Sequence, residues 1–233
     1  MPDSTNDRRI GSHPWGQSVA PLRRRVLRRV VIAAHRGFSA RHPDNSVDGF
    51  EAAIAVGADL VETDVRMSAD GVLYCHHDPD VDGALVEKTM SAEMDRFGVT
   101  RLSAALSLAR DRVGVLLDLK IETAAFGNSV LRQVRDADVE SQTVFGVRSI
   151  EQASGLRHES RTAVLLGFLA EYGAFPAFFE NGGDIARLWE EDLTRRLLAS
   201  ARNQKHPVWI TTRRGKEIEP AGAIDAPRLE ALF

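Results

Sequence analysis

Short apolar runs alternate with stretches of helical periodicity along most of the chain. Residues 30–34 form a continuous apolar run that ends at His35, which is typical of a strand buried on both faces. Residues 46–56 follow with apolar positions at helical spacing and stop at Gly57. The alternation predicts further strands at 60–65, 71–75, 113–119, 143–147, 163–169 and 208–211, and further helices at 102–109, 129–134, 150–156 and 193–201.

Strands that alternate with helices imply βαβ units and a parallel sheet. The count is about seven strands, with a candidate eighth at 223–224, and the sequence has no dinucleotide-binding or Walker A glycine motif. We therefore predict an α/β protein with a TIM (β/α)8 barrel over residues 30–233. Too few residues separate Thr212 from Ile224 for a crossover helix and its loops, so a barrel shortened or incomplete at its C-terminal end is the alternative.

Composition excludes several classes of protein. Hydrophobic residues make up 43% and charged residues 27% of the 233 residues, which is unlike collagen, a coiled coil or a largely disordered chain. A formal net charge of -3 gives no chain-wide nucleic-acid footprint, and no apolar run is long enough to span a membrane. Cys75 is the single cysteine, so an intramolecular disulfide and a cysteine zinc cluster are both excluded.

The first 29 residues differ from the rest. They hold seven arginines against two aspartates and lack apolar periodicity, so we predict a basic, disordered tail over residues 1–29. A solvated tail and a weak contact with anionic lipid headgroups are the two interpretations of its charge. The apolar run at 30–34 is shorter than a signal-peptide core, which favours a cytoplasmic protein.

Carboxylates lie at the ends of two predicted strands. Glu62 and Asp64 are two residues apart, so both side chains point to the same face, and Asp118 and Lys120 repeat this spacing after the next buried run. The carboxyl ends of parallel barrel strands converge on one mouth. Three carboxylates there form a hard oxygen site that suits Mg²⁺ or Ca²⁺ and not structural zinc.

Two histidines and two cations reach the same mouth. His35 ends the first strand and His77 lies in the loop after residues 73–75, so one imidazole can take a proton while the other gives one. Arg36 and Lys120 can neutralise a phosphoryl oxygen that gains charge. With a metal, these groups indicate phosphodiester cleavage.

The residues named above, with their neighbours in the sequence, resemble a known family. Their order and spacing over about 45 residues are similar to the N-terminal signature of the glycerophosphodiester phosphodiesterase family, and Asp118-x-Lys120 resembles its next motif. The segments that carry the resemblance are His35-Arg36-Gly37, Pro43-Asp44-Asn45-Ser46, Gly57-Ala58-Asp59, Glu62-x-Asp64-Val65, Asp70-Gly71 and His77-Asp78-Pro79.

The resemblance implies a TIM barrel that uses a divalent cation to hydrolyse glycerophosphodiesters to an alcohol and glycerol 3-phosphate, in lipid and glycerol metabolism. The partner would be a small glycerophosphodiester or a lysolipid headgroup. By position, the resemblance makes His35 and His77 the acid–base pair, Glu62, Asp64 and Asp118 the metal ligands, and Arg36 and Lys120 the phosphate contacts.

The chain departs from the family pattern in several places, and two of them bear on the reaction. Asp118 stands where the family usually has Glu, and related lyases of the sphingomyelinase D type resemble this chain in having Asp there. Cleavage of the lysophospholipase D or sphingomyelinase D kind is therefore one alternative. In the C-terminal third, Trp209 resembles a substrate-stacking Trp of the penultimate strand, with core packing as the other interpretation. Because this third matches the family least, a non-catalytic barrel that binds a phosphodiester or lipid headgroup is a further alternative.

Overall fold

Parallel strands dominate the architecture. The computed structural model describes residues 31–194 and 206–212. Seven of its strands are parallel, one pairs antiparallel with a neighbour, and two short strands form a separate hairpin. The strands are β1 (Ala33–Ala34), β2 (Leu60–Met67), β3 (Leu73–Cys75), β4 (Asp80–Val81), β5 (Ala84–Leu85), β6 (Gly114–Leu119), β7 (Thr143–Val147), β8 (Val164–Gly167), β9 (Ile185–Trp189) and β10 (Val208–Thr211).

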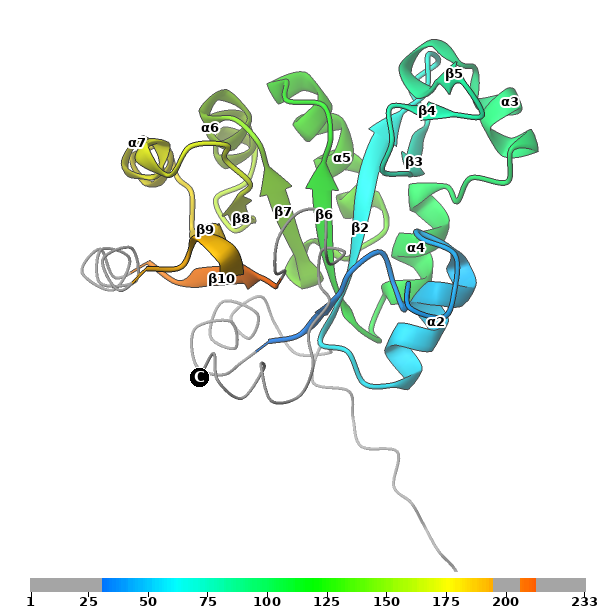
Figure 1. Ribbon diagram of the computed structural model, residues 1–233. Coiled ribbons are helices and arrows are strands. Elements are labelled where there is room, and N and C mark those ends of the chain that lie inside the picture. The colour runs from blue at the N-terminus through cyan, green and yellow to red at the C-terminus, as the bar shows by residue number, and fades with distance from the viewer. Residues whose placement is uncertain (1–30, 195–205, 213–233) are drawn as a thin grey trace, which may run out of the picture.

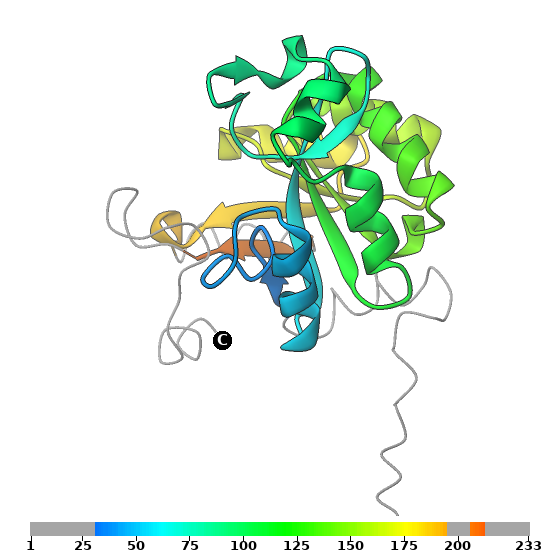
Figure 2. The same cartoon turned by 90° about the vertical axis from the view of Figure 1, so that its right-hand side faces the viewer.

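The parallel strands follow one another in sequence order across a curved sheet. The hydrogen-bonded path over the described residues is β1-β2-β6-β7-β8-β9-β10, with β3 attached to β2 outside it. The sheet curls until its edge strands β1 and β10 approach one another, as Figures 1 and 2 show. This is an α/β fold of the TIM-barrel type, as the sequence predicts.

Helices connect the strands and pack on the outer face of the sheet. Three of the helices begin at residues whose hydroxyl groups accept a hydrogen bond from the first helical turn: Ser46, Thr123 and Ser149. The α-helices are α2 (Val47–Ala55), α3 (Ser91–Arg96), α4 (Leu102–Ala109), α5 (Ala124–Asp136), α6 (Ile150–Glu159) and α7 (Phe175–Glu180), and the 3₁₀ helices are η1 (Val86–Lys88), η2 (Glu140–Gln142), η3 (Tyr172–Ala174) and η4 (Glu190–Asp192).

Strand residues alternate between two apolar layers. Those on the outer face join the large core under the helices, for example Val61, Val115 and Phe145. Those on the inner face form a second cluster that fills the barrel. The buried members of this interior cluster are Leu60, Leu116, Val144, Val164, Leu166 and Ile185, and Val31, Ala33, Phe168 and Trp209 pack against it.

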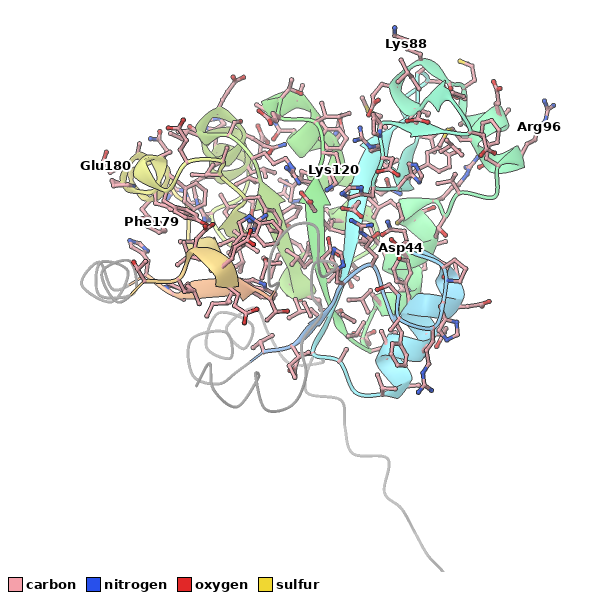
Figure 3. The ribbon with its side chains drawn as sticks, in the orientation of Figure 1. Asp44, Lys88, Arg96, Lys120, Phe179 and Glu180 are labelled. Atoms are coloured by element: carbon pink, nitrogen blue, oxygen red, sulfur yellow. The ribbon has the colours of Figure 1, made fainter. Side chains whose placement is uncertain are left out.

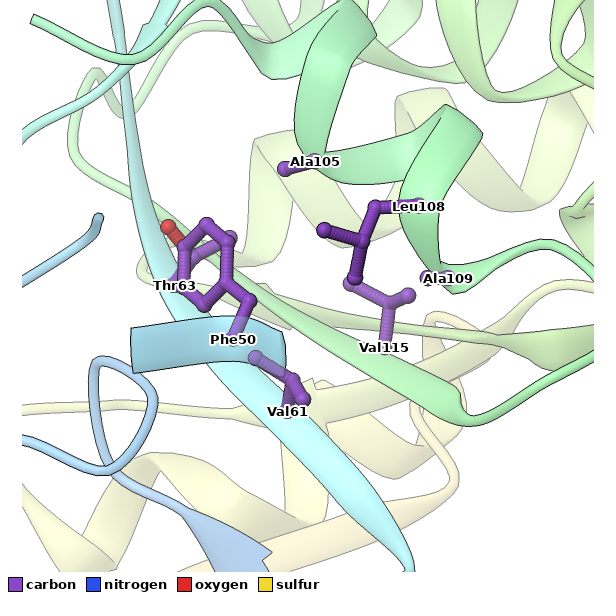
Figure 4. A pocket seen from close by; sticks show the side chains of 7 residues that line it. All are labelled: Phe50, Val61, Thr63, Ala105, Leu108, Ala109 and Val115. Carbon is purple, nitrogen blue, oxygen red and sulfur yellow. The ribbon is translucent and has the colours of Figure 1, made fainter. Parts of the chain in front are cut away.

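The outer layer is tightly filled beside the first βα unit. Helices α2 and α4 both pack near β2 and β6, and Phe50 from α2 is buried between them. Figure 4 shows the small, mostly apolar gap that is left there. It is lined by Phe50, Val61, Thr63, Ala105, Leu108, Ala109 and Val115.

One strand prediction needs correction, and one strand was not predicted. The predicted strand at 71–75 is observed as β3, but it runs antiparallel to β2 and does not belong to the barrel path. Strand β9 was not predicted, because Arg187 interrupts its apolar run. Arg187 shares a face with Ile185, which lies inside the barrel, so the interruption marks the point where the interior becomes polar.

Several sequence predictions fall outside the described residues. These are the basic tail at 1–29, nearly all of the predicted helix at 193–201 and the candidate eighth strand at 223–224. Among the helices that the structure describes, none has both the length and the apolar character needed to cross a membrane.

Candidate active site

Three carboxylates meet at the carboxyl end of the sheet. Asp64 of β2 is in register with Asp118 of β6, and Glu62 precedes Asp64 by two residues on the same inward face. All three are buried, and an oxygen from each lies within 4.8 Å of the others. The structure therefore brings together the three residues predicted as metal ligands.

The turn after β1 places a backbone donor and a guanidinium beside these carboxylates. Arg36 has a positive φ of 53° and Gly37 one of 83°, which directs the chain away from the sheet. The Arg36 amide donates a hydrogen bond of 2.8 Å to Glu62 Oε2. Gly37 is required here because a Cβ atom would lie 2.8 Å from the carbonyl carbon of Gly49 in α2.

Asn45 holds Asp64 in place from the loop before α2. It adopts a positive φ of 55° and is 4% exposed. Its Nδ2 donates to Asp64 Oδ2 over 3.0 Å, and its Oδ1 accepts from the Thr63 hydroxyl over 2.7 Å and from the Asp64 amide over 3.3 Å. One short side chain thus fixes both the backbone and the carboxylate of Asp64.

Three cations surround the carboxylate cluster. Lys120 Nζ lies 2.8 Å from Asp64 Oδ1 and 2.5 Å from Asp118 Oδ2. Arg36 Nε lies 3.3 Å from Asp64 Oδ2, and its Nη1 donates to Asp44 over 2.7 Å. Figure 3 shows Lys120 at the end of β6 and Asp44 on the loop that leads into α2.

The third cation is Arg148, which directly follows β7. Its Nε donates to Asp118 Oδ1 over 3.0 Å and its Nη2 to Asp118 Oδ2 over 2.6 Å, which is a bidentate ion pair. Sequence reasoning missed this residue, which lies 30 positions from Asp118. The available signal was an arginine placed at the end of a buried apolar strand, the same position that His35 and Lys120 occupy.

The surroundings shift the pKa values of Glu62 and Asp64 in opposite directions. Burial raises the pKa of Glu62 well above its usual range, and the neighbouring carboxylates of Asp64 and Asp118 add to this. Burial acts on Asp64 in the same direction, but the Lys120 ammonium and the hydrogen bond from Asn45 outweigh it and lower the pKa of Asp64.

The donor set fits a divalent metal ion. Clustered carboxylate oxygens that face one another in a buried site are favoured when a cation lies between them, and oxygen donors are those of Mg²⁺ and Ca²⁺. From the residues that the structure describes, Glu62 receives a hydrogen bond at Oε2 from the Arg36 amide, so it keeps acceptor capacity toward the cluster.

Two imidazoles lie beside the cluster. Burial and the neighbouring Arg36 lower the pKa of His35, so its ring is neutral near pH 7. The Nδ1 of His77 lies 2.8 Å from Asp78 Oδ1. Because a carboxylate only accepts, Nδ1 donates in this pair, which directs Nε2 away from Asp78.

The loop after β3 distinguishes His77 from His76. The His76 Nε2 donates over 2.9 Å to the carbonyl oxygen of Asp80, which holds that ring within the hairpin. The carbonyl oxygen of His77 accepts a hydrogen bond of 3.0 Å from Arg66 Nε, which fixes its backbone. The His77 side chain remains 42% exposed and open to a ligand.

Aromatic and cationic side chains from β8, β9 and β10 form the side of the site away from β2. Phe168 follows β8, and the guanidinium groups of Arg148 and Arg187 lie 5.8 Å and 4.9 Å from its ring centroid. Arg187 also stacks on Trp189 at 3.9 Å. Trp209, the predicted substrate contact, is in register with Arg187 and packs against the interior cluster.

The fold and the site together define a barrel protein with an acidic centre, flanked by cations and imidazoles, at the carboxyl ends of its strands. Residues 35–161, more than half of the chain, match the model of the glycerophosphoryl diester phosphodiesterase family. The chain belongs to this family.

Individual relatives agree with this assignment. A glycerophosphodiester phosphodiesterase from Arabidopsis thaliana is 47% identical over 49 residues, which is 21% of this chain and 13% of that protein. A crystal structure of a glycerophosphodiester phosphodiesterase from Parabacteroides distasonis has a TM-score of 0.69 and 17% identity, over 87% of each chain. A phosphodiesterase from Oleispira antarctica, in complex with the product sn-glycerol-3-phosphate, has a TM-score of 0.71 and 16% identity, over 85% of this chain and 88% of that one.

Proposed function

We propose that this chain hydrolyses glycerophosphodiesters to an alcohol and glycerol 3-phosphate with the help of a divalent cation. The observation that carries the proposal is the meeting of Glu62, Asp64 and Asp118 within 4.8 Å of one another at the strand ends. Membership of the phosphodiesterase family supports the reaction class.

The reaction adds water across one phosphorus–oxygen bond. The water oxygen bonds to phosphorus, the bond to the leaving alcohol breaks, and the proton lost by water is matched by one given to the alkoxide. His35, which is neutral near pH 7, and His77, which is held by Asp78, supply one base and one acid. Which imidazole plays which part depends on the orientation of the substrate.

Arginine and lysine bind the phosphate in this proposal. The buried Arg36 Nε is held 3.3 Å from Asp64 without a hydrogen-bond acceptor among the described residues, so a phosphoryl oxygen can supply one. Lys120 reaches both carboxylate strands and can offer a further N–H. These groups match the negative charge that grows on the phosphoryl oxygens in the transition state. Trp209 is proposed as a contact to the rest of the substrate.

Glu62, Asp64 and Asp118 would hold the metal ion, which when bound polarises the phosphoryl group and neutralises its charge. Mg²⁺ and Ca²⁺ are the two candidates, because both prefer carboxylate oxygens. Ca²⁺ accepts more ligands at longer distances, whereas Mg²⁺ demands near-octahedral geometry. A comparison of the two ions in the same assay separates them.

The test is release of glycerol 3-phosphate from a panel of glycerophosphodiesters, with Mg²⁺, with Ca²⁺ and with chelator. We expect turnover that requires the ion and that falls at least about 100-fold in His35→Ala and His77→Ala, the usual loss for a general acid or base. The matched control is His42→Ala, a histidine on the loop before α2 that is not among the predicted site residues.

Circular dichroism of each variant shows whether the fold is intact. Retained activity in both histidine variants would overturn the assignment of the acid–base pair. Release of choline from lysolipids or sphingolipids, with the phosphate left on the lipid and no glycerol 3-phosphate from any diester, would move the function to the lysophospholipase D or sphingomyelinase D kind. Trp209→Leu, assayed in the same panel, tests the substrate contact through its KM.

A further inference from the structure

Both oxygens of Asp118 accept hydrogen bonds from side-chain cations. Its Oδ1 accepts from Arg148 Nε, and its Oδ2 accepts from both Arg148 Nη2 and Lys120 Nζ, at 3.0, 2.6 and 2.5 Å. Oδ1 accepts one of these bonds and keeps acceptor capacity, but a divalent cation bound there shares the carboxylate with the Arg148 guanidinium and is repelled by it. The bidentate pair with Arg148 therefore competes directly with metal binding.

The carboxylates of the cluster are already paired with side-chain cations. Asp64 lies within ion-pair distance of Arg36 and Lys120, and Asp118 within that of Lys120 and Arg148. A divalent cation placed among the carboxylates brings two further positive charges into a buried site. Their repulsion favours a move of one of the three side-chain cations away from the carboxylates, or the binding of an anion.

Arg148 is the cation that can move most easily. Its side chain is 28% exposed, against 9% for Lys120. Arg36 is also held by its ion pair with Asp44 and by its amide on Glu62. The Arg148 guanidinium already lies over the Phe168 ring, 5.8 Å from its centroid, and this contact does not depend on Asp118.

We propose that Arg148 is a displaceable counter-ion of the metal site. It holds Asp118 when no metal is bound, gives up the Asp118 carboxylate when a divalent cation binds, and then contacts the phosphate of the substrate. This inference rests on the metal site of the proposed function. The arrangement couples the two binding events, because metal binding releases the guanidinium that the phosphodiester needs.

Calorimetric titration with Mg²⁺ or Ca²⁺ alone tests the first half of the proposal, with no turnover involved. We expect Arg148→Gln to bind the ion roughly threefold or more tightly than the unmodified protein, since the competing ion pair is removed. Arg148→Lys keeps the charge but offers a single nitrogen, so its affinity should lie between the two. Arg132→Gln, on the exposed face of α5, is the matched control and should bind as the unmodified protein does.

A merely structural role for Arg148 predicts the opposite result, because a loosened site binds the ion more weakly. Equal or weaker affinity in both Arg148 variants would overturn the inference while leaving the metal site intact. Absence of binding to every form, the unmodified protein included, would overturn the metal site of the proposed function and the inference with it.

Steady-state kinetics test the second half of the proposal. At saturating metal, Arg148→Gln should raise the KM for a glycerophosphodiester several-fold and change kcat less, because a contact to the bound phosphate is lost. An unchanged KM together with tighter metal binding would confine Arg148 to the counter-ion role and overturn the phosphate contact.

Discussion

Asn45 shows how one residue sets the geometry of an acidic centre. Its left-handed backbone directs the side chain toward β2. There it forms hydrogen bonds with the Thr63 hydroxyl, the Asp64 amide and the Asp64 carboxylate. Asn tolerates the left-handed region better than most residues, because its short polar side chain can bond locally. The motif Pro-Asp-Asn is thus explained by a backbone requirement and a hydrogen-bonding requirement at one position.

The two requirements can be measured separately. Asn45→Gly removes the side-chain bonds and leaves the backbone unstrained, so we expect a loss of about 1–3 kcal/mol in the free energy of unfolding. Asn45→Ala adds the strain of a left-handed residue, about 1 kcal/mol more. Urea unfolding of the two variants gives both values, and equal values would show that the positive φ stores no strain.

Gly146 permits the aromatic wall of the site. A Cβ atom at this position of β7 would lie 2.2 Å from Cε2 of Phe168, so the ring occupies the space that a side chain would fill. We expect Gly146→Ala to displace the ring and cost about 1–3 kcal/mol by overpacking, measured by urea unfolding. In a Phe168→Leu background the same change should cost clearly less, and an unchanged cost would mean that the ring is not what excludes the side chain.

At the scale of elements, the β2 and β6 strands do most to place the site. Their parallel register sets Asp64 opposite Asp118, and the two-residue period puts Glu62 and Lys120 on the same inward face. The next strands supply Arg148 and Phe168 at equivalent positions directly after their ends. These inward-facing strand residues continue the interior apolar cluster toward the mouth of the barrel.

A carboxylate also links elements away from the site. Glu140 bonds Arg135 at the end of α5 over 2.8 Å, and it accepts from Ser160 after α6 and from Thr162 before β8. Burial opposes ionisation of this group, but the hydrogen bonds from Arg135 and Ser160 outweigh it and lower the pKa of Glu140. The folded state therefore favours the ionised form.

The lowered pKa of Glu140 predicts that its contribution to stability depends on pH. A lowered pKa in the folded state gives stability that is present above the unfolded pKa, about 4.3, and that is lost as the pH falls through the folded value. Glu140→Gln should therefore lower the free energy of unfolding by about 1 kcal/mol at pH 7 and by less at low pH. Urea unfolding at both pH values measures the two differences. Glu151→Gln, exposed on α6, is the control, and a difference that stays constant with pH would contradict the prediction.

At the scale of the whole molecule, the site connects segments that are far apart in the chain. The β1 turn, the loop before α2, the strands β2 and β6, and the end of β7 all contribute to it. A metal that joins the carboxylates of β2 and β6 binds the folded state and not the unfolded chain. Binding must therefore stabilise the fold by mass action.

Metal should raise the thermal stability of the unmodified protein. At a concentration 100 times the Kd the gain in unfolding free energy is about 2.7 kcal/mol, and chelator should reverse it. The double variant Glu62→Gln with Asp64→Asn should show little gain. Differential scanning calorimetry with and without the ion measures this, and an equal shift in the double variant would place the bound metal elsewhere.

The sequence by itself determined the class of fold and most of the site. Alternating apolar runs and helical periods are local patterns, so the parallel α/β architecture could be predicted without the structure. The placement of His35, Glu62, Asp64 and Asp118 followed from the period of a strand and from the convergence of strand ends. These are properties of neighbouring residues, which a sequence records directly.

Only the tertiary structure decided the features that depend on contacts between residues far apart in the chain. The antiparallel direction of β3 is set by its pairing with β2, and β9 was hidden because Arg187 faces the polar mouth in place of an apolar interior. The bidentate pair between Arg148 and Asp118 joins two strand ends that are 30 residues apart. Such a pair leaves no local pattern, because its partners become neighbours only when β6 and β7 pair in the curved sheet.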